Sequence, residues 1–171
     1  NAYWEVRNLN RQYEEQTVTA DNPVDKTSLI VNPEHNNNQT LPWDIPAFMT
    51  VNYGVAESYN QTFNHYQSIN DIPNGVYALT VRGFFRPYSS REAYKGFKPG
   101  TVVYGYNGST TQTQPLPSIY AGASTDSLGV NREKRYNGYY LPENLEAASY
   151  YLQDAERGPK YDVTVMFYVE Y

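Results

Sequence analysis

The sequence contains no cysteine and no long apolar run, and both absences narrow what the protein can be. Without cysteine there is no disulfide framework, no thiolate metal site and no cysteine nucleophile. No stretch approaches about 18 uninterrupted apolar residues, so no segment is expected to span a bilayer. The first residues also lack the basic and then apolar layout of a signal peptide.

Positive charge is scarce as well, with 13 Lys and Arg against 18 Asp and Glu and a net charge of −5. Such a chain lacks the basic surface by which proteins hold phosphate backbones or anionic lipids, so neither nucleic acid nor a membrane surface is expected as a partner. There is no G-x-S-x-G elbow, no phosphate-binding G-x-x-x-x-G-K-[ST] loop and no G-x-G-x-x-G fingerprint. The sequence therefore gives no catalytic residues and does not indicate an enzyme.

Tyrosine is the residue that the chain has in excess, with 19 copies among 171 residues. Aromatic residues make up 16% of the composition, which is too many for a disordered chain and suits pleated sheet surfaces. Short β-like runs are separated by Gly, Pro and Asn turns without a regular alternation of strand and helix. This pattern predicts a mainly β fold, a sandwich or jelly roll.

Two runs with a period of two give the clearest strands. Over residues 76–86 the apolar side chains, Tyr77 among them, alternate with polar ones such as Arg82, and residues 162–170 alternate in the same way. Shorter strands are expected at residues 28–31, 47–53, 63–69 and 101–106.

Helical spacing occurs at two places beside the strands. Residues 1–16 place apolar side chains three and four apart, which predicts an N-terminal helix, and residues 143–156 predict a second, short helix. The turn-forming residues 21–25 separate the first helix from the strands. We therefore expect an N-terminal helical segment and linker over residues 1–26 and a β-sandwich domain over residues 27–171.

Several motifs occur together along the expected sandwich. They include Thr27-Ser28-Leu29-Ile30-Val31-Asn32-Pro33, Asn52-Tyr53-Gly54-Val55-Ala56-Glu57, Pro73-Asn74-Gly75-Val76-Tyr77 and Gly83-Phe84-Phe85-Arg86-Pro87. This set resembles the galactose-binding-domain-like β-sandwich modules of envelope and polysaccharide-handling proteins of gut bacteria, over roughly residues 27–170. The resemblance implies a jelly-roll fold and an exported protein, periplasmic, at the cell surface or extracellular, that binds carbohydrate or lies beside domains that do.

The same family tends to close with a further strand, and the sequence stops at Tyr171 before one, as expected of a fragment. A sheet edge left bare by its absence could pair with another chain, so a protein partner or a homodimer is expected beside the glycan.

Candidate ligand-binding residues are exposed rings beside polar groups. Sugars stack their C–H faces on aromatic rings, while amides, carboxylates and guanidinium groups bind the hydroxyls. Three places in the sequence qualify: the end of the Asn-rich loop, the loop after the strand at 76–86, and the tyrosines before the second helix. The residues chosen are Trp43, Arg86, Tyr88, Arg91, Tyr94 and Tyr139. The alternative for each ring is a structural role, and for Trp43 a place in the core or in a lid.

Metal sites have little support in the sequence. The two histidines, His35 and His65, are thirty residues apart with no second ligand at metal-binding spacing, so no zinc site is expected. Glu34 and Asn36, in an oxygen-rich loop, are the candidates if calcium is bound. No other cofactor is expected.

Three functions are consistent with these observations. The favoured one is a non-catalytic carbohydrate-binding module of an exported bacterial protein, with a glycan or polysaccharide as its partner. The alternative is a structural or adhesive spacer domain of a cell-envelope protein. A hydrolase fragment is the third, and it requires two carboxyl groups to converge in one cleft.

Overall fold

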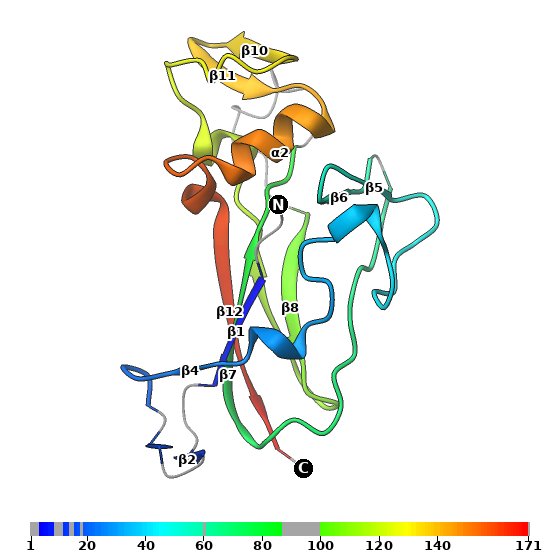
Figure 1. The fold of residues 1–171 in the computed structure, drawn as a ribbon, viewed down its shortest axis with the longest axis vertical. Coiled ribbons are helices and arrows are strands. Elements are labelled where there is room, and N and C mark those ends of the chain that lie inside the picture. Colours follow the sequence, from blue (N-terminus) through cyan, green and yellow to red (C-terminus); the bar gives the residue numbers. More distant parts are fainter. Residues whose placement is uncertain are drawn as a thin grey trace.

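The computed structural model describes residues 4–8, 12–13, 16–17, 19–59, 61–86 and 100–170, and its centre is a four-stranded antiparallel sheet (Figure 1). The strand order is β12 (Asp162–Val169), β7 (Gly75–Arg82), β1 (Trp4–Asn8) and β4 (Val24–Asp25). All neighbouring strands in this sheet run antiparallel. The mainly β fold expected from the sequence is confirmed.

The N-terminal helix predicted over residues 1–16 is wrong, because Trp4–Asn8 form strand β1. Trp4 lies opposite Val81 and Asn8 opposite Tyr77 in the register with β7. The run Trp-Glu-Val-Arg-Asn has a period of two as well as helical spacing, and pairing with a long strand decides between them. The two-residue strands β2 (Gln12–Tyr13) and β3 (Gln16–Thr17) pair with each other. The division at residue 26 stays a prediction.

One face of the central sheet is lined by apolar side chains from β7 and β12. They are Tyr77, Leu79, Val81, Val163, Val165, Phe167 and Val169, and they contribute to two buried clusters. On β12 the alternation is clear, because Val165 and Val169 are buried while Met166 and Tyr168, on the opposite face, are exposed. The period-two interpretation is therefore confirmed for residues 162–169 and for residues 76–82, whereas residues 83–86 of the first run lie beyond the end of β7. On the opposite face of β7, Thr80 is also buried, and its Oγ1 lies 2.7 Å from that of Thr164.

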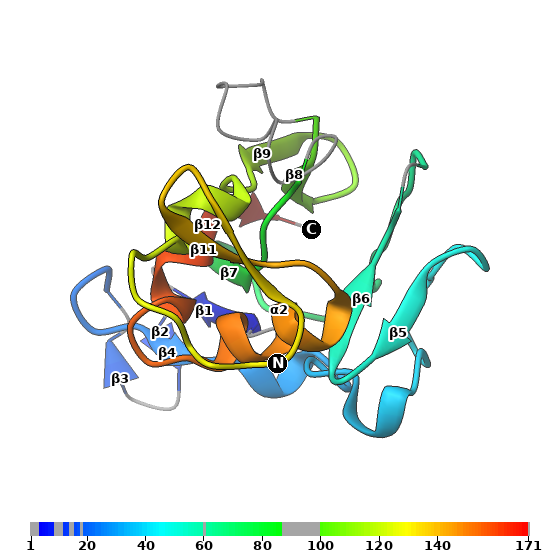
Figure 2. The ribbon, with the colours of Figure 1, turned by 90° about the horizontal axis from the view of Figure 1, so that it is seen from above.

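A β-hairpin made of β8 (Val102–Tyr106) and β9 (Thr111–Pro115) packs against the lined face, beside β12 (Figure 2). Val103 belongs to the same buried cluster as Val81 and Val165. Gly105 allows the close approach, because a Cβ at this position would overlap the ring of Phe167. The hairpin thus forms a second layer over the β12 side of the sheet.

The elements between residues 119 and 161 gather at one end of the central sheet, and we call them the head (Figure 1). They are η3 (Ile119–Gly122), β10 (Glu133–Tyr136), β11 (Tyr139–Pro142), α2 (Leu145–Gln153) and η4 (Gly158–Tyr161), where η marks a 3₁₀ helix. The short helix predicted over residues 143–156 is confirmed as α2. Its N-cap is Asn144, whose Oδ1 accepts from the Ala147 amide at 2.9 Å.

The remaining elements are short, and here the sequence predicted strands with less success. The run at 28–31 contributes instead to η1 (Thr27–Leu29), and Tyr66 at 63–69 makes only an isolated bridge with Asp44. A second 3₁₀ helix, η2 (Asn36–Asn38), precedes the hairpin of β5 (Thr50–Asn52) and β6 (Val55–Glu57). In the part of the chain that the structure describes, no helix has the length and apolar character needed to cross a membrane.

Candidate functional site

Trp43, the ring chosen from the sequence for sugar stacking, lies in the core. It is 6% exposed, and its Nε1 donates to the carbonyl oxygen of Asn32 at 2.9 Å. The ring packs edge-on against His65 with 4.8 Å between centroids, and it belongs to one cluster with Tyr77 and Val169. Trp43 therefore lies in the core, the alternative to ligand binding that the sequence left open. Little of its ring surface is accessible for stacking on a sugar.

The two histidines lie beside Trp43 and pack against each other, with ring centroids 5.1 Å apart. His35 is fully buried, with Nδ1 3.3 Å from the carbonyl oxygen of Gln39. Burial lowers the pKa of His35, and burial together with the nearby His35 lowers the pKa of His65 to about 4. Both imidazoles are therefore neutral at pH 7.

Among the described residues, no group of three His, Cys, Asp or Glu side chains is arranged to hold a metal ion. The proposed calcium role of Glu34 and Asn36 stays a prediction.

The other residues chosen from the sequence lie away from Trp43. Arg86 donates from Nη1 to the Pro142 carbonyl oxygen at 3.5 Å, which ties it to the head. Tyr139 on β11 is exposed and makes an edge-on contact with Tyr120. Tyr88, Arg91 and Tyr94 fall outside the described residues. Trp43 and the Arg86 and Tyr139 pair thus belong to different regions and do not form one site.

The outer face of β8 carries exposed rings that the sequence analysis missed. Val103 and Gly105 face the sheet, so the alternate residues Val102, Tyr104 and Tyr106 point away from it. Tyr106 is 59% exposed, Val102 is exposed and Tyr104 is half-buried. Their partners on β9 are Pro115, Thr113 and Thr111, all exposed. We call these six residues the hairpin platform.

Both platform rings are held in place through their hydroxyl groups. Tyr104 donates to Oδ1 of Asn64 at 2.9 Å, and Tyr106 donates to the Gly108 carbonyl oxygen at 2.6 Å. Asn107 fixes the hairpin turn, because its Nδ2 donates to the Tyr168 carbonyl oxygen on β12 at 2.7 Å. Rings that are already fixed lose little conformational freedom when a ligand binds.

The segment 63–67 borders the platform and joins it to the Asn-rich loop. Tyr66 and Asp44 exchange two backbone hydrogen bonds of 2.8 and 3.2 Å, and the side-chain amide of Gln67 makes two more of 2.9 Å with the backbone of Val31. The pKa of Tyr66 is raised, chiefly by a hydrogen bond to the Asp44 carboxylate and by its charge, with Tyr104 adding a smaller effect. The bridge between Asp44 and Tyr66, and the hydrogen bond from Tyr104 to Asn64 two residues before Tyr66, place Asp44 near the platform.

The Asn-rich loop itself contains a shallow hollow of about 380 Å³ lined by Asn38, Gln39, Thr40 and Leu41. Asn32 braces this loop, because its Oδ1 accepts from the Asn36 amide at 2.7 Å and its Nδ2 donates to the Gln39 carbonyl oxygen at 3.0 Å. The lining residues that the structure describes offer amides, a hydroxyl and an exposed leucine, and none of these four is charged.

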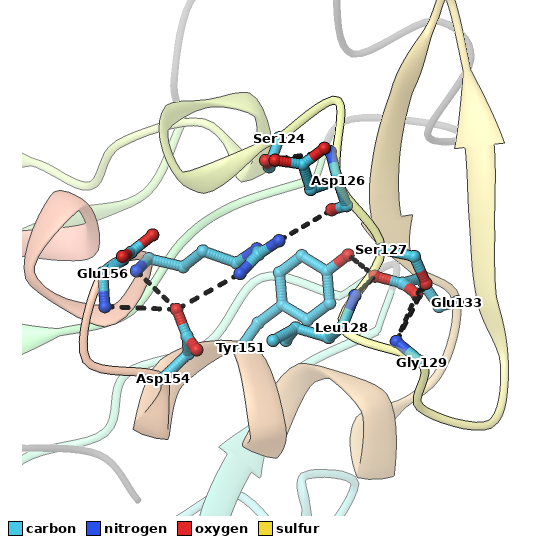
Figure 3. Close-up of polar contacts among 10 residues, drawn as sticks. Ser124, Asp126, Ser127, Leu128, Gly129, Glu133, Tyr151, Asp154 and Glu156 are labelled. Atoms are coloured by element: carbon cyan, nitrogen blue, oxygen red, sulfur yellow. Dashed lines mark hydrogen bonds and ion pairs between the residues drawn. The ribbon is translucent and has the colours of Figure 1, made fainter.

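The head contains side chains with shifted pKa values, among them Glu133 and Tyr151, which Figure 3 shows next to each other. Its Oε1 accepts from the Leu128 amide at 2.9 Å and from the Tyr151 hydroxyl, and its Oε2 accepts from the Gly129 amide at 3.2 Å and from the Ser127 hydroxyl. Burial alone would raise the pKa of Glu133, but these hydrogen bonds together lower it. Each carboxylate oxygen thus already has two donors within the protein.

Arg157 lies over the ring of Tyr151 and is itself buried. It donates to the Asp126 carbonyl oxygen at 2.7 Å and to Oδ1 of Asp154 at 3.3 Å, and its guanidinium carbon lies 5.5 Å from the centroid of the Tyr151 ring. Burial and the bond to Glu133 raise the pKa of Tyr151. These contacts hold the loop 124–129 against α2, so we interpret the network as a structural brace.

No protein-family model, curated protein or solved structure matches this chain. Its function is therefore inferred from the geometry and chemistry of its own residues.

Proposed function

We propose that the protein is a non-catalytic carbohydrate-binding module and that the hairpin platform holds the glycan. The observation that carries this proposal is the arrangement of Tyr104 and Tyr106, two residues apart on an outward strand face and each fixed by a hydrogen bond from its hydroxyl. Sugar C–H faces stack on such rings. The hydroxyls of Thr111 and Thr113 on the same face, together with the Asn64 amide, supply groups for the sugar hydroxyls.

The open shape of the platform favours a stretch of polysaccharide over a single sugar. Positions 104 and 106 are about 6.6 Å apart along the strand, so neighbouring units of one chain could contact both rings at once. The proposal includes a galactose-binding-domain-like jelly roll and export from a bacterial cell, which the motifs over residues 27–170 imply. The central sheet with a hairpin packed on it is compatible with that fold.

Calorimetric titration with soluble polysaccharides tests this function. Tyr104→Ala and Tyr106→Ala are each expected to weaken binding about tenfold, because a stacking ring is lost. Tyr150→Ala is the matched control, since Tyr150 is 50% exposed but lies on α2 in the head. Unchanged binding in both platform variants would overturn the proposal, and loss of binding in Tyr139→Ala alone would place the glycan on β11 instead.

The burial of Trp43 favours a second function, a structural or adhesive spacer domain of a cell-envelope protein. Strand β9 is exposed along its whole length, and among the described residues it pairs only with β8. Its outer backbone groups are thus positioned to add a strand from a partner protein or from a second copy. Absence of glycan binding together with concentration-dependent association in sedimentation experiments would favour this function.

A further inference from the structure

The segments that build the platform and its border are almost free of charge. Residues 35–44, 63–67 and 102–115 contain a single Asp, Glu, Lys or Arg among them, and this residue is Asp44. Their polar groups are otherwise amides, hydroxyls and the two neutral histidines. A surface of this composition is suited to a ligand that offers hydroxyl groups and no charge.

Asp44 is exposed and lies at the border of the platform. It forms an isolated antiparallel bridge with Tyr66, and residues directly opposite in such a bridge point their side chains to the same side. Two residues before Tyr66, Asn64 holds the platform ring of Tyr104 by a hydrogen bond of 2.9 Å. A chain stacked on Tyr104 would therefore lie within reach of the field of the Asp44 carboxylate.

We propose that Asp44 makes the platform selective for uncharged glycan chains over chains that carry carboxylate or sulfate groups. This inference rests on the glycan-binding function proposed above. An anionic chain would bring its charges toward Asp44 and toward a molecule of net charge −5, and the platform segments contain no Lys or Arg to offset them. A neutral chain avoids this repulsion, and its hydroxyls can donate to the carboxylate.

The test uses pairs of polysaccharides that share a backbone and differ in charge: hydroxyethyl cellulose with carboxymethyl cellulose, and dextran with dextran sulfate. At low ionic strength the full chain is expected to prefer the neutral member of a pair by about 3- to 10-fold. About 0.5 M salt should narrow this preference, because charges farther apart than a few ångströms are then screened.

Asp44→Asn keeps the shape and the hydrogen-bonding oxygen while removing the charge. This variant is expected to bind the anionic member about 3-fold more tightly than the wild type does, with binding of the neutral member unchanged. Asp126→Asn is the matched control, because Asp126 is exposed in the head and its loss changes the net charge equally. An unchanged unfolding temperature of Asp44→Asn shows that the bridge to Tyr66 is intact.

The possible results separate the two proposals. Equal or tighter binding of the anionic members by the wild type would overturn the selectivity and leave glycan binding intact. A full preference retained by Asp44→Asn would overturn the role of Asp44. Absence of binding to all four polysaccharides would count against the glycan-binding function and, with it, against this inference.

Discussion

The head and the hairpin platform arrange their polar groups in opposite ways. In the head, charged side chains turn inward: Glu133 accepts from the Leu128 and Gly129 amides, and Arg157 donates to Asp154 and to the Asp126 carbonyl oxygen. On the platform, neutral hydroxyls and the rings of Tyr104 and Tyr106 face outward. A perturbed pKa often marks a functional site, but in the head it follows from bonds that hold a loop in place. Exposed groups that are fixed yet still able to bind a ligand are the better indication of function.

The largest expected effect is that of Tyr151→Ala in the head. This ring is fully buried, and its hydroxyl donates to Glu133, so we expect a loss of about 3–5 kcal/mol in the free energy of unfolding. Tyr104→Ala removes a half-exposed ring from the platform and should cost less than about 1.5 kcal/mol. Urea denaturation of both variants measures the difference. An equal loss in both variants would show that the ring of Tyr104 contributes as much to stability as the buried ring of Tyr151.

The next largest effect is expected for Glu133→Gln, which keeps the shape of the side chain and removes its negative charge. One acceptor oxygen becomes an amide nitrogen that faces donors, so we expect a loss of about 2 kcal/mol in the free energy of unfolding. Binding of a glycan to the platform should be unchanged. Weakened binding at full stability would instead give the head a part in ligand recognition.

Acidification should act on the buried cluster around Trp43, at His35 and His65. Their pKa values are lower in the folded protein than the ordinary 6.5, so the unfolded chain takes up protons first as the pH falls below 6.5. The contribution of the two neutral histidines to the free energy of unfolding is therefore fully present above pH 6.5. It declines toward pH 4, by about 1–2 kcal/mol at pH 5.

Urea denaturation at pH 7, 6 and 5 tests this decline. These are the only histidines in the chain, and His65→Gln should remove much of the decline above pH 5. A stability that stays flat over this range would contradict the neutral, buried state of the pair.

The fold was predictable where a signal extends over many residues. Residues 162–170 and the helix near 145–153 each repeat one period several times, and packing reinforces it. The run 1–16 fitted a helix only by its spacing, and pairing with β7, remote in sequence, decided its structure. Residues 63–69 have strand-like composition, yet a strand needs partners along its length, and only Tyr66 finds one.

The platform was partly visible in the sequence. Tyr104 and Tyr106 alternate with Val103 and Gly105 in a run predicted to be a strand, and this alternation places two rings on one face. The sequence could not show which face is covered. It also could not show that Asn64 lies beside Tyr104, because tertiary structure brings these residues together across 40 positions. The burial of Trp43 could not be read from the sequence for the same reason, since it depends on His65 and Tyr77.

The smallest expected effect is that of Tyr104→Phe, which keeps the ring and removes the hydroxyl that bonds to Asn64. Since this bond is exposed, stability should fall by only about 0.5–1 kcal/mol. Glycan binding should weaken about 2- to 3-fold, because the ring still stacks but must be ordered on binding. Asn64→Ala removes the same bond from the other side and should give the same titration result. If Tyr104→Phe instead weakens binding as much as Tyr104→Ala does, the hydroxyl and not the ring holds the ligand. The platform would then act through directed polar contacts, as the brace in the head does, and stacking would not be its basis.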